Sequence, residues 1–138
     1  MSDTKRHDGF RFRLENTSGI PVYRQIIDQV LTGISTGALA AGAQLPTVRQ
    51  VAVDLEINPN TVVRAYRELE IRQILTTQQG MGTFITPRKI KKDEADHNRR
   101  LTRFVAEFTA RAGAEGFTMP ELVERLTELL NEQEKKRR

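Results

Sequence analysis

Two stretches with helical apolar spacing, residues 48–55 and 59–72, lie only three residues apart in this chain of 138 residues. In each stretch apolar side chains recur at positions i, i+3, i+4 and i+7, which predicts a helix with one buried face. Thr47 and Gln50 have the spacing of a capping box for the first helix, and Asn58 is a good N-cap for the second. The pattern therefore predicts two short helices joined by a tight turn.

The elements on either side of this pair extend it into a larger pattern. Residues 21–36 carry apolar side chains every four positions and predict a helix that ends at Gly37. Residues 75–78 and 83–86 are short β-prone runs on either side of a glycine-containing turn, as in a β-hairpin. Helix, short helix, tight turn, helix and two-stranded ribbon is the order of a winged helix-turn-helix, whose second paired helix enters the DNA major groove.

The second helix of the predicted pair, the recognition helix, separates its polar and apolar side chains cleanly. Its inner side is apolar apart from Tyr66, and its outer side carries Asn60, Thr61, Val63, Arg64 and Arg67. An amide can pair with adenine, a guanidinium with guanine or phosphate, and a hydroxyl with phosphate. The free N–H groups at the start of the helix also favour a nearby phosphate. This set predicts DNA reading, and an ordinary amphipathic surface helix is the alternative.

Two further helices are predicted in the last third of the chain, at residues 101–112 and 120–133. Each carries an apolar stripe, and the two helices are too small to enclose both stripes in a core of their own. We expect a second copy of the chain to cover the stripes, and packing onto the chain's own winged domain is the alternative. The candidate dimer contacts are Phe104, Phe108, Leu122, Leu126 and Leu129. A two-fold dimer would place its recognition helices about 34–36 Å apart, which predicts an inverted-repeat operator.

The predicted fold is mainly α with a small β-hairpin wing, a winged helix-turn-helix followed by a C-terminal helical hairpin used for dimerisation. We place a flexible basic N-terminal segment at residues 1–13, the DNA-binding domain at 14–87, and a basic linker with the two-helix dimerisation tail at 88–138. Residues 88–103 contain seven basic and three acidic side chains, whereas residues 20–87 contain five of each sign. This local excess predicts an anionic partner, and a solvated linker is the alternative.

The residue types argue against catalysis and against a membrane. The chain has no cysteine, which excludes disulfides and thiolate metal sites and favours a reducing compartment. Its two histidines lack ligand spacing, and no phosphate loop or nucleophile elbow is present. No apolar run approaches the roughly 18 residues of a spanning helix, and residues 1–13 are polar and charged. We therefore expect no enzyme activity, cofactor, metal or membrane insertion, and a cytoplasmic protein that is nucleoid-associated when bound to DNA.

Several blocks of residues together point to one family. The blocks are Pro21-Val22-Tyr23-Arg24-Gln25-Ile26, Leu45-Pro46-Thr47-Val48-Arg49, Asn58-Pro59-Asn60-Thr61-Val62, Arg64-Ala65-Tyr66, Glu68-Leu69-Glu70 and Gly80-Met81-Gly82-Thr83-Phe84. From Ile20 to Ile85 the chain resembles the winged-helix domain of GntR-family bacterial transcription regulators. The Asn-Pro-Asn-Thr turn and a tail of only two helices resemble the YtrA subfamily. The members of that subfamily are short dimeric repressors that are often encoded beside ABC-transporter genes.

The resemblance implies a set of DNA contacts. By position it implies that Arg49 contacts a phosphate or a base, that the recognition helix and its N-cap sit at the major groove, and that Gly80 lies at the wing tip. With the outer helix face and the wing turn, the candidate DNA contacts are Arg49, Asn58, Asn60, Thr61, Arg64, Arg67, Gln79 and Gly80. A surface ion pair of Arg49 with Asp54 or Glu56 and a plain hairpin turn at Gly80 are the alternatives.

Three positions depart from the family's pattern. Glu56 places a carboxylate in the turn between the paired helices, where the family commonly has a small residue. Gln73 replaces the glycine that usually ends the recognition helix, which predicts a C-terminus without a left-handed cap. Met81 occupies a wing position where the family often has lysine or arginine. We therefore expect the N-terminal segment, with Arg11 and Arg13, or the basic run after the wing to supply part of the phosphate attraction.

The sequence thus predicts a sequence-specific DNA-binding transcriptional regulator, a homodimeric repressor that binds double-stranded DNA at an inverted-repeat operator. The resemblance implies that its own operon, with an ABC transporter, is the candidate target. Repression rather than activation follows from the resemblance alone. The alternatives are a nonspecific architectural DNA-binding protein and a winged-helix protein-interaction module, which the salt and sequence dependence of binding would separate. Residues 88–138 leave no room for a separate ligand domain, so a small-molecule effector, if one exists, binds at the dimer interface or between the domains.

Overall fold

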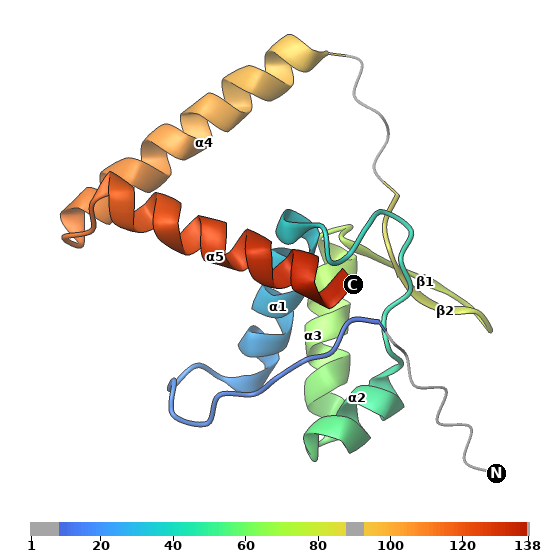
Figure 1. Ribbon diagram of the computed structural model, residues 1–138. Helices are drawn as coiled ribbons and strands as arrows, with labels where there is room; N and C mark the ends of the chain where they lie inside the picture. Colours follow the sequence, from blue (N-terminus) through green and yellow to red (C-terminus); the bar gives the residue numbers. More distant parts are fainter. Residues whose placement is uncertain (1–8, 88–92, 138) are drawn as a thin grey trace. The chain divides into compact units, whose positions relative to one another are not determined.

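The computed structural model describes residues 9–87 and 93–137 and divides the chain into two units, Met1–Arg88 and Lys89–Arg138. The elements of the first unit are α1 (Val22–Thr36), α2 (Val48–Leu55), α3 (Pro59–Ile71), β1 (Leu75–Gln78) and β2 (Gly82–Ile85), and those of the second are α4 (Glu94–Ala114) and α5 (Met119–Arg137) (Figure 1). This order confirms the predicted fold class, a mainly helical chain with a winged helix-turn-helix and two further helices.

The helix starts follow from local capping, as the sequence predicts. Thr47 Oγ1 accepts a hydrogen bond from Gln50 N at 3.1 Å, and Gln50 Oε1 accepts one from Thr47 N at 2.9 Å, so the capping box of α2 is complete. Asn58 Oδ1 accepts from Asn60 N at 2.9 Å at the start of α3. Gly37, at φ 84°, ends α1 in the left-handed region. These caps fix where the paired helices begin.

The end of α3 differs from the prediction. Gln73 lies at φ 60°, so a left-handed cap forms without glycine, and the prediction that this cap is absent is wrong. Ile74 N donates to Leu69 O and Gln73 N to Glu70 O, both at 2.9 Å. This is the two-bond Schellman pattern, which satisfies carbonyls at the helix end and outweighs the backbone strain. Glu56, at φ 54°, ends α2 in the same conformation.

The wing is an antiparallel pair that a third segment extends. Leu75 of β1 pairs with Ile85 of β2, and Gln78 pairs with Gly82 at the other end. The segment before α2 lies along β2, where Leu45 N donates to Thr83 O at 2.8 Å. The base of the wing is therefore joined by backbone hydrogen bonds to the chain that enters α2.

The core of the first unit lies around α3, which packs against α1, α2 and β1. The largest fully buried side chains are Ile26, Ile27 and Val30 of α1, Val62 and Leu69 of α3, and Leu45. Because the buried residues of α3 recur at helical spacing, burying them directs the opposite side of α3 outward.

The described part of the N-terminal segment, residues 9–13, is packed on the domain rather than flexible. Phe12 belongs to the core, and Phe10 packs against it with ring centroids 5.1 Å apart. Arg13 N donates to Gln29 Oε1 at 2.8 Å. The prediction of a flexible segment that ends at residue 13 is therefore wrong for residues 9–13. Their aromatic side chains alternate with arginines along an extended segment, and a search for helical spacing does not detect that pattern. Residues 1–8 of that prediction lie outside the described residues.

The tail helices are longer than predicted. α4 begins at Glu94 instead of Leu101, with Asp93 as N-cap and an Asp96–Arg99 ion pair of 3.7 Å in its first turns. The polar residues of these turns carry no apolar stripe, so periodicity could not reveal them. The first part of the predicted basic linker, residues 88–92, lies outside the described residues.

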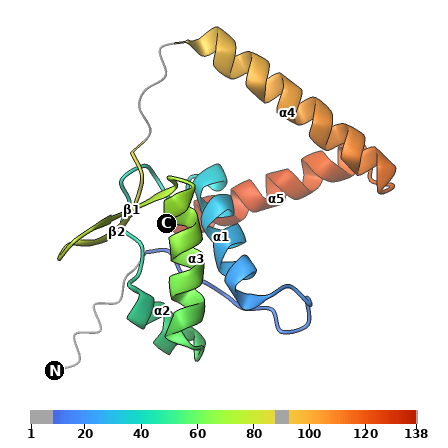
Figure 2. The ribbon, with the colours of Figure 1, turned by 180° about the vertical axis from the view of Figure 1, so that it is seen from behind.

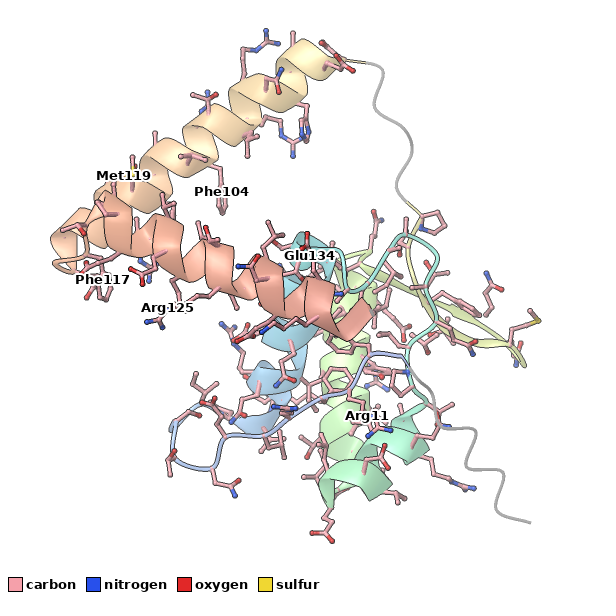
Figure 3. All side chains as sticks on the ribbon, viewed as in Figure 1. Arg11, Phe104, Phe117, Met119, Arg125 and Glu134 are labelled. Carbon is pink, nitrogen blue, oxygen red and sulfur yellow. The ribbon has the colours of Figure 1, made fainter. Side chains whose placement is uncertain are left out.

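Within the second unit, α4 and α5 diverge from the turn that joins them, as both views show (Figure 1, Figure 2). Figure 3 shows Phe104 on α4 and Met119 at the start of α5, and both side chains are more than half exposed. Ala112 is the one buried residue among the described residues of these two helices.

No helix in residues 9–87 or 93–137 combines the length and apolar character needed to cross a bilayer.

Candidate nucleic-acid interface

The solvent-facing side of α3 is the centre of the candidate interface. Asn60, Arg64 and Arg67 are spaced at i, i+4 and i+7, on the side of the helix opposite the buried residues, and all three are exposed. Neither arginine takes part in an ion pair within the described residues. The helix therefore presents one amide and two guanidinium groups to an incoming polyanion, with their donors unpaired by acidic side chains.

Arg64 is held by an aromatic ring from α1. Its guanidinium carbon lies over the ring of Tyr23, 3.8 Å from the ring centroid. The two residues line an open groove between α1 and α3, together with Asn60, Val63, Arg67, Glu68 and Ile71. Tyr23 is absent from the candidate site residues because its spacing places it on the apolar stripe of α1, and the sequence carries no signal that its ring reaches α3.

The start of α3 places two more candidates at the edge of this face. Asn58 is exposed, and its side-chain oxygen is occupied by the cap of α3, which leaves its NH₂ group as the available donor. Thr61 is half-buried, and its backbone N–H donates to Asn58 O at 3.0 Å. Both residues therefore have a structural role at the start of α3, next to the outward face that carries Asn60.

Arg49 stands on α2 and is exposed. Two ion pairs are formed among the described residues, and both lie in the tail helices. The alternative interpretation, a pair of Arg49 with Asp54 or Glu56, is therefore not found in the part of the chain that the structure describes. The guanidinium of Arg49 remains available to a ligand.

The wing tip carries the remaining candidates, Gln79 and Gly80, both exposed. Gly80, at φ 78°, makes the turn possible, and Met81 beside it is 66% exposed. Gln44 Nε2 donates to Met81 O at 3.1 Å and braces the turn from the segment before α2. The tip itself carries no charged side chain, because residues 79–82 are Gln, Gly, Met and Gly.

The helix pair is fixed from behind by Tyr66. Its hydroxyl donates to Pro46 O at 2.6 Å, which ties α3 to the chain that leads into α2. Burial raises the pKa of the Tyr66 hydroxyl, so this donor keeps its proton throughout the neutral range. This hydrogen bond therefore helps to fix α3 relative to the segment that enters α2.

Helix pair, wing and outward polar face define a winged helix-turn-helix of the kind that reads DNA. Residues 22–85 match the family model described as "Bacterial regulatory proteins, gntR family". The chain is 38% identical over 108 residues to the uncharacterized HTH-type transcriptional regulator YhcF of Bacillus subtilis. The matched residues make up 78% of this chain and 88% of YhcF. The chain therefore belongs to the GntR family of bacterial regulatory proteins, and it is a transcriptional regulator with a DNA-binding helix-turn-helix.

Two further comparisons agree with this membership. The HTH-type transcriptional repressor YtrA of Bacillus subtilis is 40% identical over 74 residues, 54% of this chain and 57% of YtrA. The solved structure of a GntR family transcriptional regulator from Listeria monocytogenes superposes with a TM-score of 0.55 at 32% identity, covering 80% of this chain and 96% of that one. Within the described residues, no group of His, Cys, Asp and Glu side chains is arranged to hold a metal ion.

Proposed function

We propose that this chain is an operator-specific DNA-binding regulator that reads its site with the outward face of α3. The observation that carries the proposal is the row of Asn60, Arg64 and Arg67, exposed and without acidic partners on a helix whose other side is buried. Asparagine recognises adenine and arginine recognises guanine through paired hydrogen bonds in the major groove. Arg49, Asn58, Thr61, Gln79 and Gly80 surround this row as candidate contacts to the backbone and the groove edges.

The regulator acts as a homodimer held by the tail. Ten of the fourteen exposed large hydrophobic side chains in the described residues lie between Leu101 and Leu130, and they include Phe104, Phe108, Leu126 and Leu129. Exposing so many apolar side chains on two diverging helices is unfavourable in water. A second copy of the chain carries the same apolar surface, so the two surfaces can cover each other. A two-fold pair of this kind presents two recognition helices to an inverted repeat. Leu122, which is half-buried, completes the proposed contact set.

The sense of regulation is repression. This proposal rests on the similarity to YtrA, which is described as a transcriptional repressor. The target is the chain's own operon, with an ABC transporter as its neighbour. A small-molecule effector of the regulator would bind at the dimer interface, since the described residues of the second unit, 93–137, contain only α4 and α5.

A fluorescence-anisotropy titration tests the proposal. Labelled DNA from the region upstream of the chain's own gene is titrated at several salt concentrations against a scrambled competitor. We expect binding that weakens steeply with salt and survives the competitor, because phosphate contacts set the affinity and base contacts set the preference. If the scrambled competitor displaces the labelled DNA, the protein is instead a nonspecific architectural DNA-binding protein. No binding at any salt concentration would favour a protein-interaction module.

Two arginine variants make the test specific to α3. Arg67→Ala removes a guanidinium from the proposed reading face, and we expect it to reduce both affinity and preference for the upstream DNA. Arg125→Ala makes the same change of charge on α5, where the side chain is exposed and pairs with Glu128 at 3.2 Å. Equal effects of the two variants would show that net charge, and not the face of α3, determines binding.

A further inference from the structure

The stack of Arg64 on Tyr23 joins the centre of the reading face to a different helix. Tyr23 is the second residue of α1, half-buried and packed against the core, so its ring is anchored by the fold. Arg64 is exposed and lies between Asn60 and Arg67 on the outward row of α3. The distance of 3.8 Å from its guanidinium carbon to the ring centroid is that of a close cation–π contact.

The ring is the one fixed partner of this guanidinium in the described part of the chain. Arg64 forms no ion pair and no side-chain hydrogen bond there. Glu68 lies four residues further along α3 and lines the same groove, yet its carboxylate does not pair with Arg64. Oppositely charged side chains at i and i+4 on a helix ordinarily attract one another, so the stack competes with an available intrahelical pair.

We propose that Tyr23 is a positioning residue that keeps Arg64 directed at DNA and away from Glu68. The inference rests on the proposed function and adds to it a specificity-determining role for a residue outside the helix-turn-helix pair. A guanidinium that lies over a ring instead of in an ion pair has no acidic partner for its N–H groups, and those groups are what bond to guanine O6 and N7. Holding this long side chain in place before binding also lowers the conformational entropy lost on association.

The test compares Tyr23→Leu with Tyr23→Phe in the full-length chain. Leucine keeps an apolar side chain on the core but removes the ring, whereas phenylalanine keeps the ring and removes only the hydroxyl. The probe is a duplex that the wild-type protein enriches from a random-sequence pool, with a scrambled duplex as reference. We expect Tyr23→Leu to lower the preference for the selected duplex by about two- to fivefold, the range of an exposed cation–π contact, and Tyr23→Phe to retain it within about twofold.

Two double variants separate positioning from a general structural role. In an Arg64→Ala background, Tyr23→Leu should cause no further loss, because the group that Tyr23 positions is gone. In a Glu68→Gln background, the loss caused by Tyr23→Leu should be smaller, because the competing carboxylate is neutral. A purely structural role of Tyr23 would lower the thermal midpoint and give the same loss of binding in all three backgrounds.

The side-chain resonance of Arg64 gives a readout without DNA. The ring should shift the Arg64 Nε–H signal of the free protein, and Tyr23→Leu should abolish that shift while Tyr23→Phe preserves it. An unshifted wild-type signal, or equal preference of Tyr23→Leu and wild type for the selected duplex, would overturn the inference. Stronger binding by Tyr23→Leu would also overturn it, since the ring would then hold Arg64 away from DNA. If the wild type enriches no sequence at all, the proposed function itself fails.

Discussion

Replacing Gln73 by glycine should stabilise the protein, even though the change removes a whole side chain. Gln73 is exposed, makes no side-chain hydrogen bond among the described residues, and lies at φ 60°. A non-glycine residue in the left-handed region costs about 1–2 kcal/mol, and glycine loses about 0.5–1 kcal/mol more backbone entropy on folding. The difference leaves a net gain in the free energy of unfolding of about 0.5–1 kcal/mol.

The assay is urea unfolding followed by circular dichroism at one fixed protomer concentration, because dimerisation makes apparent stability depend on concentration. With a urea m-value of about 1.5 kcal/mol/M, the midpoint should rise by about 0.3–0.7 M at unchanged slope. Arg72→Gly is the matched control, since Arg72 is also exposed but lies at φ −78°, and it should be destabilised by about 0.5–1 kcal/mol. A fall in the midpoint of Gln73→Gly, or the same sign for both variants, would refute the reasoning.

Three further predictions follow from the core, the wing and the tail. Tyr66→Phe should cost about 1 kcal/mol at neutral pH through the lost hydrogen bond to Pro46. Because burial raises the pKa of Tyr66 above its ordinary 10.0, wild-type unfolding free energy should also fall as the pH rises beyond 10.0, a fall that this variant should reduce in alkaline urea titrations. Gly82→Ala should destabilise the protein by about 1–3 kcal/mol, since Gly82 lies at φ 126°, a backbone conformation that residues with a Cβ rarely adopt; an unchanged thermal midpoint would contradict this. Phe104→Glu should convert the dimer to monomer in sedimentation velocity while far-UV circular dichroism keeps its helical signal, and a dimer of unchanged affinity would exclude Phe104 from the interface.

Most of the fold could be predicted because local signals and apolar spacing agree. The capping box at Thr47 and the N-cap at Asn58 set the starts of α2 and α3, and each predicted start is confirmed. The apolar stripe of α3 likewise decided which of its side chains face outward. The outward position of Asn60, Arg64 and Arg67 was therefore readable from spacing, whereas their contact with DNA stays a prediction.

The features that sequence reasoning missed are those that depend on tertiary contacts or on backbone hydrogen bonds. Phe12 joins the core from an extended segment, which a search for helical spacing does not detect. Gln73 adopts a conformation that favours glycine, because two backbone hydrogen bonds and the packing of the following strand offset the strain. Tyr23 meets Arg64 across two helices whose crossing no local pattern specifies.

The central claim is that the outward face of α3 reads base sequence. The most direct test is selection of bound duplexes from a random pool, followed by sequencing, with the wild type and Arg67→Ala side by side. The account predicts that the wild type enriches an inverted repeat whose half-sites lie about one DNA turn apart, and that Arg67→Ala loses the preference at one symmetric pair of positions while keeping the others. No enriched sequence, or the same enriched sequence with both proteins, would contradict it.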